Sequence, residues 1–143
     1  MRVLTIAATA VVALLGAVPA SADPGAAGAT APLYPPPFVD HVSWTQWDHL
    51  ASLRVYPTAS GRAAARQLGS AGPEVDEAWS EVLALAADAG TPGMREQFLC
   101  HWELAEVLQP GKSSWNLEPW RPVVDATTMV GSGCNPGGSE EGF

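Results

Sequence analysis

An export signal at the amino terminus limits what the rest of this chain can fold into. Arg2 is followed by an apolar run over residues 3–18 and then by Pro19-Ala20-Ser21-Ala22. This is the pattern of a secretory signal with a small-residue cleavage site. We expect cleavage between Ala22 and Asp23, and a mature protein that is secreted into the extracellular space. Removing 22 of the 143 residues leaves 121, which is enough for one domain and too few for a two-domain enzyme.

The alternative interpretation of the apolar run is a retained membrane helix. The run is short for a span of roughly 20 residues, and Pro19 interrupts it. We therefore expect no membrane span in the mature protein.

The net charge argues against a nucleic-acid partner. The whole chain carries a formal charge of −8, and cleavage of the signal removes the positive charge of Arg2. Proteins that bind nucleic acid through counterion release need clustered cationic side chains. We therefore expect no nucleic-acid partner.

The cysteine content predicts one disulfide. The chain has two cysteines, Cys100 and Cys134, and an exported protein meets an oxidising environment. Closing the loop between them would stabilise the fold by roughly 3–4 kcal/mol in the chain-entropy model. The alternative is a free Cys100 thiol that acts as a nucleophile or a ligand beside His101.

Composition divides the chain into four segments. Residues 1–22 are the expected signal peptide, and residues 23–37 form a linker rich in Ala, Gly and Pro. Such a composition does not bury enough apolar surface to offset the entropy of ordering. The expected folded domain covers residues 38–136, and residues 137–143 form a flexible tail of Gly, Ser and Glu.

Alternating apolar residues predict a hairpin at the start of the domain. Strands are expected over residues 38–47 and from Leu53 to Val55, with Asp48-His49 in the turn and Pro57 closing the second strand. Thr58 or Ser60 is expected to cap a short helix that ends near Gly69.

Helical spacing dominates the middle of the chain. Pro73 is placed to begin an amphipathic helix whose apolar residues continue to Ala86 and which Gly90 is expected to end. The segment between Pro92 and Pro110 also fits a helix, although alternation within residues 98–108 is compatible with a strand; its Leu, Glu and Ala content favours the helix.

The end of the domain is expected to be extended. Glu118 and Arg121 each precede a proline, which disfavours the helical region of backbone space, so residues 115–122 should be extended. Residues 123–130 are expected to form a closing strand. The predicted fold is a small single α+β domain with an N-terminal β-hairpin, two to three helices and an extended Trp/Pro-rich C-terminal segment closed by one disulfide.

Three motifs carry a resemblance to a known family. They are Gln97-Phe98-Leu99-Cys100-His101-Trp102, then Trp115-Asn116-Leu117-Glu118-Pro119-Trp120-Arg121-Pro122, and finally Gly133-Cys134-Asn135-Pro136-Gly137-Gly138. With these motifs, the chain resembles a family of small secreted actinobacterial proteins defined only as a domain of unknown function. The resemblance runs from about Phe38 to the C-terminus. It implies a secreted, disulfide-closed domain and brings no assigned activity with it.

Six tryptophans are distributed over the predicted elements. Buried aromatic side chains contribute much to the core of a small domain, so we expect most of them, and Trp44, Trp79 and Trp102 in particular, to be core residues. Trp115 and Trp120 lie on the proline-rich segment and are expected to stay partly exposed, offering flat faces to a sugar ring or a protein side chain.

Two charged residues on the same segment complete the predicted binding set. Glu118 and Arg121 are three residues apart, and they can pair and clamp the loop or face a ligand. The leading interpretation is a binding or interaction module for an extracellular protein or a cell-wall glycan. Its predicted contact residues are Trp115, Glu118, Trp120 and Arg121.

The alternative function is a small secreted hydrolase or toxin-like enzyme. It would use His101 as general base or acid and Glu118 as its partner. The residues around His101 instead favour a half-buried histidine with a structural hydrogen bond, and the chain contains no established catalytic motif. We expect no cofactor, and no metal, because the Asp40-His41 and Asp48-His49 pairs match no ligand spacing.

Overall fold

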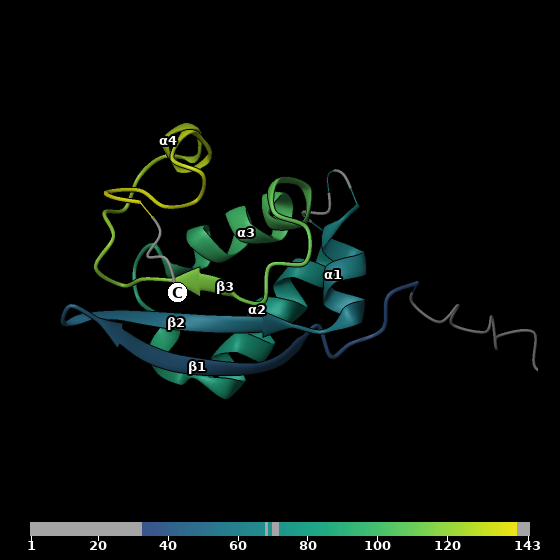
Figure 1. The fold of residues 1–143 in the computed structure, drawn as a ribbon. Coiled ribbons are helices and arrows are strands. Elements are labelled where there is room, and N and C mark those ends of the chain that lie inside the picture. The colour runs from purple at the N-terminus through teal and green to yellow at the C-terminus, as the bar shows by residue number, and fades with distance from the viewer. Residues whose placement is uncertain (1–32, 68, 70–71, 140–143) are drawn as a thin grey trace, which may run out of the picture. The chain divides into compact units, whose positions relative to one another are not determined.

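A β-hairpin is the first regular element in the part of the chain that the structure describes (Figure 1). The structure is a computed structural model, and it describes residues 33–67, 69 and 72–139. The expected signal peptide 1–22, linker residues 23–32 and tail residues 140–143 lie outside the described residues.

The hairpin consists of strands β1 (Val39–Trp47) and β2 (Leu50–Pro57). Its two turn residues, Asp48 and His49, have φ angles of 43° and 67°. Positive φ at both central positions is the geometry of a two-residue type I′ turn, whose twist matches that of the strands it joins. The predicted hairpin and its turn are confirmed, and β2 begins three residues earlier than expected.

A third, short strand completes an antiparallel sheet of order β1-β2-β3. β3 (Trp115–Leu117) pairs with β2, with Leu117 opposite Leu53 and Trp115 opposite Val55. On the other side of β2, Trp44 of β1 lies opposite Leu53. Because side chains alternate along a strand, Trp44 and its neighbours two residues away share the face of the sheet that carries these buried residues.

Helices follow the hairpin. α1 (Ala59–Ala65) begins at Thr58, whose hydroxyl accepts the N–H of Gly61 at 2.9 Å, as predicted for a cap. α2 (Pro73–Leu85) has proline in its first turn, and the short 3₁₀ helix η1 (Ala87–Ala89) follows it. α3 (Met94–Leu108) shows that the ambiguous segment is a helix.

The helices cover one face of the sheet and bury an aromatic core. The rings of Phe98 and Trp102 on α3 each lie 6.0 Å from the ring of Trp115 on β3, measured between centroids. Trp79 of α2 is 5.5 Å from Phe98. The expectation that Trp79 and Trp102 are core residues is therefore confirmed.

The predicted closing strand over residues 123–130 is wrong. This part of the chain contains helix α4 (Ala126–Gly131), which packs on α3. The Asp125 side chain accepts the N–H of Thr128 at 2.8 Å and caps the helix, so local capping outweighs the strand propensity of the β-branched residues. Within the described residues the fold has four α-helices, rather than the two to three expected.

The end of the expected linker makes backbone contacts with α1. The Ser60 hydroxyl donates to the carbonyl of Pro35 at 2.6 Å, and the Thr58 hydroxyl donates to the carbonyl of Pro37 at 2.8 Å. These bonds fix the direction in which the chain enters β1.

Candidate functional site

The predicted binding pair, Glu118 and Arg121, is an ion pair in the protein interior. Arg121 Nε donates to Glu118 Oε2 at 2.6 Å, and the two side chains are 0% and 3% exposed for Arg121 and Glu118 respectively. Ser52 of β2 donates its hydroxyl proton to Glu118 Oε1 at 2.9 Å. Both carboxylate oxygens of Glu118 are therefore occupied by partners within the fold.

The backbone of Glu118 is held as firmly as its side chain. Gln97 on α3 donates its amide to the Glu118 carbonyl and accepts the Glu118 N–H, both at 2.9 Å. Arg121 continues the network, since its Nη1 donates to the carbonyls of Pro136 at 3.1 Å and Gly138 at 2.7 Å. The network joins the sheet, α3 and the C-terminal segment, which favours the clamp interpretation of the Glu118–Arg121 pair.

The two tryptophans of this segment differ in exposure. Trp115 is 0% exposed, so the expectation that it offers an open aromatic face is wrong; its position on β3 opposite Val55 turns the ring into the core. Trp120 is half-buried, and the Arg121 guanidinium lies 4.5 Å from the centre of its ring. Of the predicted contact residues, Trp120 alone has substantial exposed surface.

His101 is a buried, neutral histidine. Its Nε2–H donates to the backbone carbonyl of Asn116 at 3.0 Å, and the residue is 4% exposed. Burial, together with the positive charges of Lys112 and Arg121, lowers the pKa of His101 to about 3, while the Asn116 hydrogen bond acts in the opposite direction. A ring with so low a pKa is a poor proton carrier near neutral pH.

The structure does not bring His101 and Glu118 together as a catalytic pair. His101 lines a small cavity of about 130 Å³ with Cys134 and Lys112, and Glu118 does not contribute to it. Within the described part of the chain, their hydrogen bonds go to other groups.

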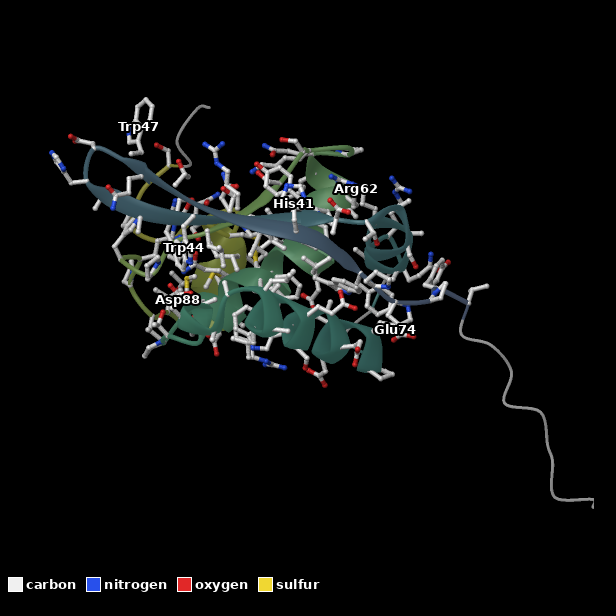
Figure 2. All side chains as sticks on the ribbon, turned by 90° about the horizontal axis from the view of Figure 1, so that it is seen from below. His41, Trp44, Trp47, Arg62, Glu74 and Asp88 are labelled. Atoms are coloured by element: carbon white, nitrogen blue, oxygen red, sulfur yellow. A yellow bond between two sulfur atoms is a disulfide. The ribbon has the colours of Figure 1, made fainter. Side chains whose placement is uncertain are left out.

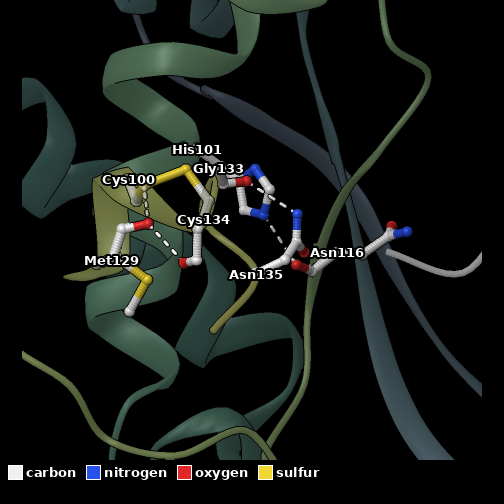
Figure 3. Close-up of a disulfide and its surroundings, with 8 residues drawn as sticks. Cys100, His101, Asn116, Met129, Gly133, Cys134 and Asn135 are labelled. Atoms are coloured by element: carbon white, nitrogen blue, oxygen red, sulfur yellow. Dashed lines mark hydrogen bonds between the residues drawn. A yellow bond between two sulfur atoms is a disulfide. The ribbon is translucent and has the colours of Figure 1, made fainter. Parts of the chain in front are cut away.

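Cys100 and Cys134 lie at disulfide distance, with their Sγ atoms 2.10 Å apart (Figure 3). The contact ties α3 to the turn that follows α4. The neighbouring backbone is also bonded, because the N–H of Cys134 donates to the Met129 carbonyl at 3.0 Å. Neither cysteine is a free thiol, which excludes the reactive Cys100 interpretation for this structure.

An open groove lies where the hairpin extends past the helices. It has a volume of about 510 Å³ and is located between the end of β1, η1 and the loop that follows β3. Its lining residues are Trp44, Thr45, Gln46, Ala51, Asp88, Thr91 and Pro119.

Trp44 is the aromatic side chain of the groove, and Asp88 fixes its orientation. The indole Nε1–H of Trp44 donates to Asp88 Oδ1 at 3.1 Å, and Figure 2 shows the two side chains turned toward each other. Trp44 is 38% exposed, so the expectation that it is a core residue is wrong. It occupies the core-facing side of β1, but at a point that the helix layer leaves open.

Two further exposed apolar side chains lie at the hairpin tip, on the face of the sheet opposite to Trp44. Trp47 is 48% exposed and Leu50 is 38% exposed, and Figure 2 shows Trp47 projecting at the end of the hairpin. Large exposed aromatic residues are enriched at protein interfaces.

A second open hollow, of about 530 Å³, lies between α2 and α3. Its tryptophan, Trp79, is 8% exposed and belongs to the core, and its Arg95 is engaged with Asp76 at 2.7 Å. We therefore take the hairpin groove, with its exposed ring, as the candidate functional site.

Sequence reasoning missed most of this groove. The sequence pattern places Trp44 in the core, while Gln46 and Asp88 belong to no motif. The alternation of Trp44 and Gln46 in a strand does predict that they share one face. What the sequence does not indicate is that η1 places Asp88 against that face, beyond the end of α2.

Two kinds of site are not found in the described part of the chain. Residues 33–67, 69 and 72–139 contain no group of three or more His, Cys, Asp or Glu side chains that could hold a metal ion. No helix in the same residues is long and apolar enough to cross a membrane.

Comparison with known proteins gives a family without an assigned activity. The family described as "Protein of unknown function (DUF2599)" matches residues 39–137. An uncharacterized protein of Mycobacterium tuberculosis strain H37Rv is 56% identical over 146 residues, covering 98% of this chain and 97% of the relative. An uncharacterized protein of Mycobacterium leprae is 51% identical over 112 residues, covering 76% and 87%. No solved structure matches the chain significantly.

Proposed function

Because the chain belongs to the DUF2599 family of proteins of unknown function, we propose its function from the groove itself. The protein is an exported binding module that holds an extracellular ligand, a protein or a cell-wall glycan, in the groove under its hairpin. The uncharacterized mycobacterial relatives support an actinobacterial family of unknown function.

The observation that carries the proposal is the half-exposed ring of Trp44, fixed by Asp88. An aromatic face that is oriented before the ligand arrives loses little entropy on binding. The groove also has polar lining residues, namely Gln46 on the same face of β1 as Trp44, and Thr91. An apolar surface with a few convergent polar groups is the usual composition of a binding site.

The buried groups support binding rather than hydrolysis. The alternative enzyme requires an accessible acid or base, but His101 is 4% exposed and Glu118 is 2% exposed. Glu118 is bonded to Ser52 and Arg121, and His101 is bonded to the Asn116 carbonyl, so both side chains hold parts of the fold together. We therefore assign both side chains a role in stabilising the fold.

Export rests on two features. The first is the signal pattern with its expected cleavage between Ala22 and Asp23. The second is the Cys100–Cys134 contact, since stable disulfides are typical of oxidising compartments. Intact-mass spectrometry of protein from a culture supernatant should give a chain that begins at Asp23. A retained signal would contradict the proposed export.

The binding function is tested by measuring how much of the exported chain is retained on two materials. One is purified peptidoglycan sacculi, and the other is the proteins of the culture filtrate of the same organism. Retention is compared for the wild type, Trp44→Ala and Asp88→Asn, with Leu108→Ala as control. Leu108 is 63% exposed on α3 and does not line the groove. We expect Trp44→Ala to reduce retention on one material at least tenfold and the control to be unchanged. Equal retention of all four proteins would refute the groove as the binding site.

A further inference from the structure

The groove lies beside a strand edge that has no partner strand among residues 33–67, 69 and 72–139. β1 is the first strand of the sheet order β1-β2-β3, and it is nine residues long. Most of its residues are exposed. An open edge presents backbone N–H and C=O groups on which an added strand can pair.

The turn determines which backbone groups face outward. In a hairpin with a two-residue turn, the residues that flank the turn, here Trp47 and Leu50, exchange backbone hydrogen bonds with each other. Bonded and non-bonded pairs then alternate along the strands. The backbone groups of Val42, Trp44 and Gln46 therefore point away from β2 and toward the open edge.

The same residues place their side chains on the groove face. Trp44 and Gln46 line the groove, so one stretch of β1 provides both an open backbone edge and a side-chain pocket. A residue of an added strand that lies opposite Trp44 directs its side chain to the same face of the sheet. That side chain would enter the space beside the Trp44 ring and Asp88.

The charge of the groove determines which ligand side chain it favours. Among the described residues that line the groove, Asp88 is the one that carries a charge. Its Oδ1 accepts the Trp44 indole, and its Oδ2 has no hydrogen-bond partner among the described residues. An aromatic face next to a carboxylate attracts a cation, through the ring quadrupole and through charge pairing. The net charge of −8 for the whole chain acts in the same direction.

We propose that the ligand is an extended segment of a partner protein that adds as a strand to the β1 edge and places a Lys or Arg side chain against the Trp44 ring and the Asp88 carboxylate. This inference rests on the proposed function, because it uses the same groove. It explains why the groove lies beside an open strand edge, a feature that a glycan ligand does not need.

The test uses end-blocked nonapeptides with alternating Thr and Val, whose central residue is Arg, Lys, norleucine or Glu. Each is titrated into the ¹⁵N-labelled exported chain, and amide and indole NMR shifts are recorded. We expect shifts at the backbone amides of Val42, Trp44 and Gln46 and at the Trp44 indole. The Arg peptide should bind roughly three- to tenfold more tightly than the norleucine peptide, and the Glu peptide more weakly than both.

Two controls separate the parts of the inference. N-methylation of the peptide amides that face β1 should abolish binding, because the methyl groups remove the donors of the added strand. Asp88→Asn should remove the preference for Arg over norleucine while keeping the fold. Leu108→Ala should bind all peptides as the wild type does.

The outcomes distinguish this inference from the proposed function. Equal binding of the Arg, norleucine and Glu peptides, or the absence of shifts along β1, would overturn the inference. If soluble peptidoglycan fragments shift the Trp44 indole and the peptides do not, the groove is a glycan site and the strand-addition proposal is wrong. If no probe shifts the Trp44 indole, while peptidoglycan sacculi or culture-filtrate proteins retain the wild type and Trp44→Ala equally, both proposals fail.

Discussion

The buried imidazole of His101 should make the protein sensitive to mild acid, and replacing it should remove that sensitivity. The ring donates one hydrogen bond to the Asn116 carbonyl and is 4% exposed. His101→Gln is the informative change, because a glutamine amide can donate to the same carbonyl and does not titrate.

The direction and size of this pH dependence follow from the protonation of His101 in the folded and unfolded chains. Burial lowers the pKa of His101 from 6.5 to about 3, so the unfolded chain binds a proton at pH values where the folded chain does not. The contribution of His101 to the free energy of unfolding is therefore fully present above about pH 6.5, and it falls as the pH drops toward about 3. Each pH unit below 6.5 costs about 1.4 kcal/mol, so lowering the pH from 7 to 5 should cost the wild type about 2 kcal/mol from this residue alone.

The assay is denaturant unfolding of the exported chain at several pH values between 5 and 7, followed by tryptophan fluorescence. The wild type should lose about 2 kcal/mol over this range, and His101→Gln should be nearly flat. His49→Asn, in the exposed hairpin turn, controls for loss of an imidazole and should keep the wild-type slope. If wild type and His101→Gln have the same pH dependence, the assignment of a neutral, buried His101 is refuted.

The remaining stability predictions concern the features that hold the domain together. Glu118→Gln should destabilise the fold by about 3–5 kcal/mol in denaturant unfolding, because it removes the charge that compensates a buried guanidinium; a cost below about 1 kcal/mol would contradict the clamp. Replacing Cys100 and Cys134 together by Ser should lower the free energy of unfolding by roughly 3–4 kcal/mol, and an unchanged value would mean that the bond does not form. Gly61→Ala should lower the melting temperature, because an added Cβ would lie 2.2 Å from the Phe38 carbonyl oxygen; Gly131→Ala, with nothing within 4 Å, should not, and similar effects would contradict this packing.

The early part of the fold was predictable because its signals are local. Alternating residues, the Asp48-His49 turn and the Thr58 cap each act within a few positions of the chain. The α3 helix followed from its composition. The segment after Arg121 was mispredicted because Asp125 caps a helix whose β-branched residues favour a strand on propensity alone.

The candidate site was harder to predict because it depends on contacts that are distant in sequence. Glu118 and Arg121 were identified as a pair, but whether they face a ligand or the core depends on Ser52 and Gln97, 66 and 21 residues away from Glu118. Trp44 follows the pattern of a core residue, and its exposure depends on where the helix layer ends. Sequence periodicity reports the face of a strand and not what covers it.

The most direct test of the binding groove is the accessibility of Trp44 in the presence of its natural surroundings. Hydroxyl-radical footprinting of the exported protein, alone and mixed with cell envelopes and culture filtrate of the same organism, measures oxidation of each side chain by mass spectrometry. We predict that oxidation of Trp44 falls in the mixture while oxidation of Leu108 is unchanged. If these materials retain the protein while Trp44 is oxidised as readily as before, the groove is not the binding site.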